Sequence, residues 1–115
     1  MDADHYAIHQ KHSYVRQKVW EALGCLVSTK QFRIRLTEAA QPLSQLTNTH
    51  PHLVAELPED VRRKMDCVVQ ALTKYQPEWK GGSVAEASVS RLTPRQRTKI
   101  AQEILEIYVA VSGGL

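Results

Sequence analysis

Three histidines near the amino terminus have the spacing that would let one helix present imidazoles to a metal ion. His5, His9 and His12 follow one another at i, i+4 and i+7, positions that lie along one helix face. That face is partly apolar, because His12 falls within the stripe that Ile8 and Val15 begin. Burial as a neutral core residue is the plainer interpretation of His12. Metal binding is therefore the weakest of three functional hypotheses, and we expect no cofactor.

A second group of residues could bind an anion. Four basic residues and no acid occur between Arg91 and Lys99. The dipole of a helix disfavours cations in its first turns, so we expect these residues either to pair with acids or to meet an anionic partner such as a phosphate. A nucleic-acid-binding protein is the resulting alternative function. Its candidate contacts come from two basic segments: Arg33, Arg35, Arg91, Arg95, Arg97 and Lys99.

The six residues from Leu92 to Arg97, with the sequence LTPRQR, resemble the opening of a LuxR-type helix-turn-helix domain. The resemblance implies that a turn and a DNA-recognition helix follow. Only 18 residues come after Arg97, and one apolar helix with a glycine stop accounts for them. We therefore interpret the run as a helix cap and not as a DNA-binding fold.

The residue types needed for catalysis do not fall into a recognisable arrangement. We find no nucleophile with a neighbouring base and no pair of carboxylates in an apolar setting. The turn formed by Gly81, Gly82 and Ser83 lacks both the Walker lysine and the Rossmann glycine spacing. We interpret it as an ordinary turn before a capped helix, and we expect a protein that is not an enzyme.

The last 24 residues predict the helix that bears most directly on function. Thr93 and Gln96 have the spacing of a capping box, Pro94 suits the first helical position, and Gly113 suits the stop. Apolar side chains surround nearly the whole of the last two turns, so this helix must be covered on every side. A chain of 115 residues has limited core material for that task. We expect the cover to come from a second copy, through five residues: Leu105, Ile107, Tyr108, Val109 and Val111.

The preferred function is therefore a non-enzymatic helical module, regulatory in character, that works by homo-oligomerisation and by binding a protein partner. Two tryptophans are candidate anchors. Trp20 lies at the edge of the first apolar stripe, and Trp79 lies in a loop with Pro77 and two glycines. We expect Trp79 to fold back over the bundle. The alternative is that Trp79 points outward and anchors an interface.

Composition and patterning predict a single all-α domain over residues 1–115. The chain is 43% apolar and 23% charged, which is typical of a globular protein, and it has only five glycines and five prolines. We expect a small bundle of four main amphipathic helices, with one or two short helices in the connections. The first two main helices should cover residues 4–27 and 29–46. The third should run from residue 58 to the loop that begins at residue 76, and the fourth should lie between Thr93 and Gly113.

The second predicted helix contains one ambiguous segment. Ser28 and Gln31 have capping-box spacing, which predicts a helix from about Thr29. The residues from Phe32 to Leu36 alternate as in a strand but also fit a longer helical stripe, and the helix explains more residues. We expect Pro42 to bend or break this helix near residue 41.

The expected location is the cytoplasm, without membrane contact. Asp2 and Asp4 stand where a secretory signal would carry positive charge. The longest apolar run, residues 107–111, is far shorter than the roughly 20 residues of a membrane span. Cys25 and Cys67 lack a CxxC spacing, so we expect two reduced thiols. The net charge of +3 is too small to identify a partner class alone.

Overall fold

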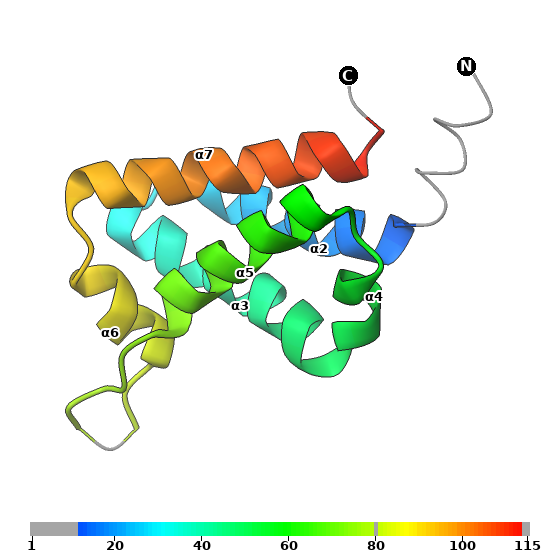
Figure 1. Ribbon diagram of the computed structural model, residues 1–115. Helices are drawn as coiled ribbons and strands as arrows, with labels where there is room; N and C mark the ends of the chain where they lie inside the picture. The colour runs from blue at the N-terminus through cyan, green and yellow to red at the C-terminus, as the bar shows by residue number, and fades with distance from the viewer. Residues whose placement is uncertain (1–11, 80, 114–115) are drawn as a thin grey trace.

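The computed structural model describes residues 12–79 and 81–113, which form six helices and no strand (Figure 1). Four helices are long: α2 (Ser13–Leu26), α3 (Phe32–Thr49), α5 (Glu59–Thr73) and α7 (Pro94–Val111). Two are short: α4 (Pro51–Ala55) and α6 (Val84–Ser90). The predicted all-α fold, with four main helices and short helices in the connections, is confirmed.

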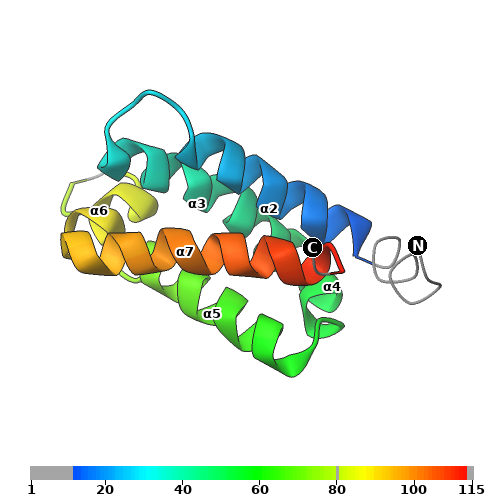
Figure 2. The same cartoon turned by 90° about the horizontal axis from the view of Figure 1, so that it is seen from above.

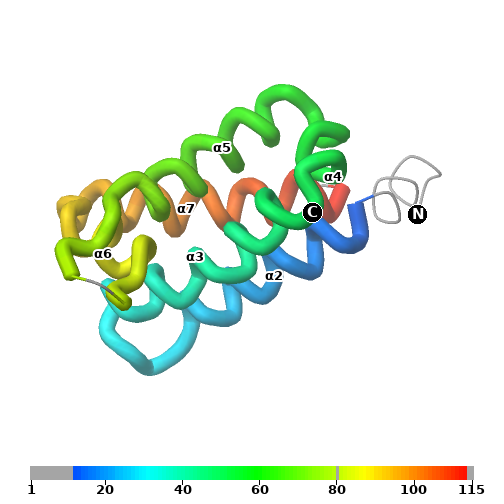
Figure 3. Tube along the Cα trace, turned by 90° about the horizontal axis from the view of Figure 1, so that it is seen from below, coloured from blue at the N-terminus to red at the C-terminus, as the bar shows by residue number. Residues whose placement is uncertain are grey.

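The four long helices lie side by side, and each runs opposite to the long helix before it. Figure 2 shows α7 lying between α2 and α5 on one side of the molecule. Figure 3 shows α3 on the opposite side, where it also contacts both α2 and α5. The short helices close the two ends, with α4 joining α3 to α5 and α6 joining α5 to α7. This arrangement leaves the outer sides of α2 and α7 next to each other.

One apolar core joins all six helices. Its fully buried side chains come from helical stripes, such as Val19 in α2, Leu43 in α3, Met65 in α5 and Ile104 in α7. Burying one such side chain stabilises the fold by about 1.5–3 kcal/mol, which makes the core the main source of stability. The stripes explain why these sequences form helices: each one has a single face to bury.

The starts of α6 and α7 are capped as the sequence predicts. The Thr93 hydroxyl accepts a hydrogen bond from the Gln96 backbone N–H at 3.1 Å, and the Thr93 N–H donates to the Gln96 side chain at 2.8 Å. The Ser83 hydroxyl likewise accepts from the Glu86 N–H at 3.2 Å. The stop is also as predicted, because α7 ends at Val111 and Gly113 has a φ of 89°.

The connection between α2 and α3 differs from the prediction. Within the described residues α2 begins at Ser13, and the earlier part of the predicted first helix lies outside them. The capping box at Ser28 is wrong, since α3 begins at Phe32 and its N-cap Gln31 makes no side-chain hydrogen bond. Residues 27–31 are needed to reverse the chain between two adjacent antiparallel helices. The ambiguous segment to Leu36 is helical, and Leu36 is fully buried.

Pro42 does not end α3. The helix continues for seven residues beyond it, to Thr49, so of the two expected effects near residue 41, a bend or a break, the break is wrong. Proline has no N–H to donate to the carbonyl four residues earlier, which costs one helical hydrogen bond. Pro42 is itself buried, and Leu43 and Leu46 beside it are fully buried. Tertiary packing of this face therefore outweighs the local preference of proline to stop a helix.

Candidate functional site

The expected interface residues of α7 divide between core and surface. Ile107 and Val111 are each 1% exposed and belong to the chain's own core. Side chains buried this fully are inaccessible to a partner in the folded chain. Leu105 is 51% exposed, and Tyr108 and Val109 are partly buried. Of the five residues expected at the interface, only Leu105, Tyr108 and Val109 are therefore accessible to a partner.

Trp20 of α2 extends the apolar surface of α7. The Trp20 side chain is 60% exposed, and its ring centroid lies 5.4 Å from that of Tyr108. Leu105 lies three residues before Tyr108 and four before Val109, so the three α7 residues are neighbours on the helix surface. Trp20, Leu105, Tyr108 and Val109 together are called the α2–α7 face below. Three of these residues were expected at the interface from the sequence. The fourth, Trp20, was predicted only to lie at the edge of an apolar stripe.

The surroundings of the α2–α7 face are polar. A hollow of about 470 Å³ adjoins it, lined by Trp20, Tyr108 and residues of the first turns of α2 that include the charged Arg16. Lys18 pairs with Glu21 at 3.2 Å on α2. On the other side of α7, an ion pair of 2.8 Å joins Lys64 of α5 to Glu106. An apolar centre with a polar rim is the usual composition of a protein–protein interface.

Two of the arginines proposed to bind an anion act within the fold. Arg35 Nη1 donates to the Leu26 carbonyl oxygen at 2.6 Å, and the guanidinium lies 5.2 Å from the centre of the Phe32 ring. Arg97 Nε donates to the Val89 carbonyl oxygen at 3.2 Å. Each arginine thus donates to a carbonyl near the end of a helix, α2 or α6; the Val89 carbonyl also accepts from the Leu92 N–H at 3.1 Å. These contacts stabilise the fold and orient both guanidinium groups toward the protein.

Two further candidates are paired with acids. The guanidinium of Arg91 lies 4.4 Å from the centre of the Tyr75 ring, and its Nη2 is 3.5 Å from Glu78 Oε1. Lys99 Nζ lies 4.0 Å from Glu103 Oε1, one turn along α7. Both pairs are solvent-exposed, where an ion pair contributes about 0–1 kcal/mol. Pairing of this kind offsets the unfavourable position of the cations near the start of α7.

Arg95 and Arg33 are exposed and form no ion pair with any residue in the described ranges 12–79 and 81–113. Arg95 lies in the first turn of α7, and Arg33 lies in the first turn of α3. Of the six candidates, Arg33 and Arg91 line one hollow. Arg35 and Arg97 are directed to backbone carbonyls instead.

The predicted histidine site is only partly described. His12 is 7% exposed and precedes α2 as its N-cap, while His5 and His9 lie outside the described residues. His50, at the junction of α3 and α4, packs against Tyr14 with 4.5 Å between ring centroids. The described part of the chain contains no group of three or more histidine, cysteine or acidic side chains placed to hold a metal.

The loop between α5 and α6 holds the second exposed tryptophan in place. Trp79 is 67% exposed and does not fold back over the bundle as expected. Its ring lies against two glycines: an added Cβ at Gly81 would stand 3.6 Å from the indole, and one at Gly82 would stand 3.3 Å from it. The Cβ at Gly82 would also come within 2.6 Å of Pro77 Cβ, a clash. Only glycine at residue 82 therefore allows the loop to close against the indole.

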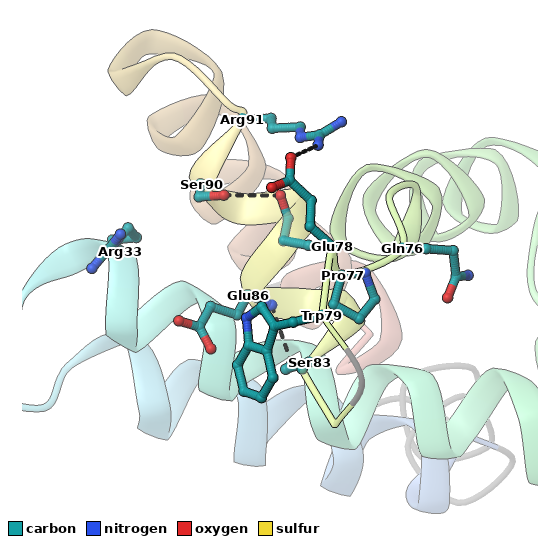
Figure 4. Close-up of a pocket in the computed structure, with 11 residues that line it drawn as sticks. Arg33, Gln76, Pro77, Glu78, Trp79, Ser83, Glu86, Ser90 and Arg91 are labelled. Carbon is teal, nitrogen blue, oxygen red and sulfur yellow. Dashed lines mark hydrogen bonds and ion pairs between the residues drawn. The ribbon is translucent and has the colours of Figure 1, made fainter.

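A hollow of about 320 Å³ lies beside this indole, between the loop, α6 and the start of α3 (Figure 4). Its charged lining residues are Arg33, Glu78, Glu86 and Arg91. Figure 4 shows Glu78 paired with Arg91, and Glu86 of α6 lying between the indole and Arg33 in that view. The sequence pointed to Trp79 and the arginines separately. It gave no signal for Glu86, which reaches them only through the fold.

Among the described residues, the Cys25 thiol and the Lys64 ammonium have clearly shifted pKa values. Burial raises the pKa of the Cys25 thiol above its ordinary value, and the nearby Glu38 carboxylate adds to the effect. The hydrogen bond from Lys64 to Glu106 raises the pKa of the Lys64 ammonium. A raised thiol pKa lowers the thiolate fraction, so Cys25 is not an activated nucleophile. Neither shift creates an acid or base poised for catalysis.

Comparisons of the chain with protein families, with curated proteins and with solved structures find no match. In the part of the chain that the structure describes, every helix is too short or too polar to cross a membrane.

Proposed function

We propose that the protein is a non-enzymatic helical module that associates with a second copy of itself through the α2–α7 face. The observation that carries the proposal is an exposed tryptophan, Trp20, packed against Tyr108 beside a half-exposed Leu105. A tryptophan side chain can bury about 250 Å², so an exposed fraction of 60% leaves roughly 150 Å² in water. At about 25 cal/mol per Å², covering this area would contribute roughly 4 kcal/mol per copy before the entropic costs of association.

A second copy fits this face because a two-fold interface must be self-complementary. The α2–α7 face has a protruding aromatic side chain, Trp20, and a hollow next to it that the same indole and Tyr108 help to line. A two-fold axis near Trp20 would let each indole enter the hollow of the other copy. Lys18 and Glu21 of α2 pair within the chain, while Arg16 lines the hollow itself, so each copy would bring one arginine to the contact.

The area available predicts a weak dimer. A stable interface covers about 800 Å² on each partner, and the four residues of the α2–α7 face supply only part of that. The remainder would come from the polar rim of α2 and α7. We therefore propose association that depends on concentration in the micromolar range, as suits a regulatory module.

Binding of nucleic acid, the alternative function, has less support from the contacts. Arg35 and Arg97 donate to backbone carbonyls, and Arg91 is paired with Glu78. Arg35 and Arg97 keep their charge but are directed to the backbone, and Glu78 offsets the charge of Arg91, which weakens the salt-dependent attraction on which phosphate binding depends. The remaining contacts for this alternative are Arg33 and Arg95, which are exposed and form no ion pair with a described residue.

Size-exclusion chromatography with light scattering, at low and high salt, tests the proposal. We expect a mass that rises with concentration toward twice 13.0 kDa, changes little with salt and shows protein absorbance alone. Leu105→Lys should keep the mass at that of the monomer without loss of helicity. Ile34→Lys is the matched control, since Ile34 is also an exposed apolar residue, 39% exposed, but lies on α3. A monomer at every concentration, or a complex with nucleic acid that salt removes, would contradict the proposal.

A further inference from the structure

The hollow beside Trp79 has the features of a built binding site. The Trp79 indole is exposed, with Gly81 and Gly82 lying close beside it, and Gly82 leaves room for Pro77. A backbone hydrogen bond of 3.2 Å from the Gly82 N–H to the Trp79 carbonyl closes the same turn. The exposed indole leaves a large aromatic face available to a ligand. Its packing against Gly81 and Gly82 limits the orientations of the ring, which lowers the entropic cost of binding.

Some of the charged side chains around the Trp79 indole are paired within the fold, and others are free to bind a ligand. Arg91 and Glu78 pair with each other, and Arg91 also lies over the Tyr75 ring. Glu86 and Arg33 form no ion pair with a residue that the structure describes. In the view of Figure 4 the Glu86 carboxylate lies nearer the indole than Arg33 does. Among the described residues, the unpaired charge that lies beside the indole in this view is therefore the Glu86 carboxylate.

We propose that this hollow binds the guanidinium group of an arginine side chain from a peptide or protein partner. The face of an indole attracts a cation, and a planar guanidinium can lie over it while donating two hydrogen bonds to a carboxylate. Trp79 supplies the face, and Glu86 supplies the carboxylate. The volume of about 320 Å³ is at the small end of ligand sites, which fits one side chain and not a large cofactor.

The same geometry argues against a phosphate or a nucleic-acid base at this place. A phosphate over the indole would lie beside the Glu86 carboxylate, where like charges repel. Arg91, the second cation of the hollow, is already neutralised by Glu78. Arg33 lies on the far side of Glu86 in Figure 4 and would weakly oppose a bound cation. This assignment is independent of dimerisation through the α2–α7 face, which involves other residues.

Nuclear magnetic resonance of the ¹⁵N-labelled protein tests the site directly. The indole N–H signals of Trp20 and Trp79 are told apart with Trp79→Phe. The probe is N-acetylarginine amide, and the control is N-acetylcitrulline amide, which has the same shape without the charge. We expect the arginine probe to shift the Trp79 signal in a saturable way, and we expect the citrulline probe and the Trp20 signal to show no such change.

Charge variants test whether the hollow binds a cation through Glu86 or an anion through Arg33. Glu86→Gln should weaken binding of N-acetylarginine amide by about two- to fivefold, the range of an exposed ion pair. Arg33→Gln should leave the affinity unchanged or increase it. Inorganic phosphate and an oligothymidylate, at matched ionic strength, should leave the Trp79 signal in place. Equal binding of the citrulline probe, weaker binding by Arg33→Gln, or a Trp79 shift with either anion would overturn the assignment.

Discussion

The fully buried hydroxyl of Ser88 is expected to be one of the most sensitive polar groups in the molecule. Its Oγ accepts a hydrogen bond from the Tyr75 backbone N–H at 2.9 Å and donates to the Val84 carbonyl at 2.8 Å. Ser88→Ala removes the acceptor and leaves the Tyr75 N–H, at the end of α5, without this partner. An unsatisfied buried group costs about 1–3 kcal/mol. The melting temperature should fall by roughly 4 °C for each kcal/mol in a chain of this size.

Urea denaturation followed by circular dichroism measures this loss. Ser90→Ala is the matched control, because Ser90 is exposed on the same helix and its hydroxyl donates only to the Ala87 carbonyl at 2.9 Å. The control should change the free energy of unfolding by less than about 0.5 kcal/mol. The variant also bears on the Trp79 hollow, since Tyr75 supports Arg91. Equal stability of Ser88→Ala and Ser90→Ala would refute the role given to the buried hydroxyl.

Three further predictions concern single residues. Thr93→Ala should lower the free energy of unfolding by about 1 kcal/mol through loss of the capping box; an unchanged urea midpoint would contradict this. Gly24→Ala should raise the free energy of unfolding by about 0.5–1 kcal/mol, because Gly24 lies inside α2 with nothing within 4 Å of an added Cβ; a lower midpoint would disprove it. Burial raises the pKa of the Cys25 thiol, so in a Cys67→Ser variant the alkylation rate of the native protein should rise at higher pH than that of the urea-unfolded chain. Coincident pH profiles would show that the native environment does not shift this thiol.

The parts of the fold that sequence predicts well are those determined by neighbouring residues. The capping box at Thr93 needs only Gln96 three residues later, and the structure contains both of its hydrogen bonds. Ser28 and Gln31 have the same capping-box spacing, but no helix begins there. Residues 27–31 form the turn between the packed helices α2 and α3 instead. Pro42 fails in the same way, since the burial of its helix face outweighs a local preference. Packing between helices therefore decides where local signals conflict with it.

The candidate surfaces show the same limit. Sequence identified Arg35 and Arg97 by their charge, but only the fold brings them to the carbonyls of Leu26 and Val89. Periodicity showed that the end of α7 is apolar all round, yet it did not separate buried Ile107 from the exposed side of the helix. Residues that approach from different helices leave no pattern along the chain.

Sedimentation equilibrium of the wild-type protein beside Trp20→Ala and Trp79→Ala tests the central claim most directly, because both variants remove an exposed tryptophan but only one belongs to the α2–α7 face. We predict a monomer–dimer equilibrium for the wild type and for Trp79→Ala, and a monomer of 13.0 kDa for a normally folded Trp20→Ala. A monomeric wild type, or equal association of both variants, would contradict the assignment of the α2–α7 face as the site of self-association.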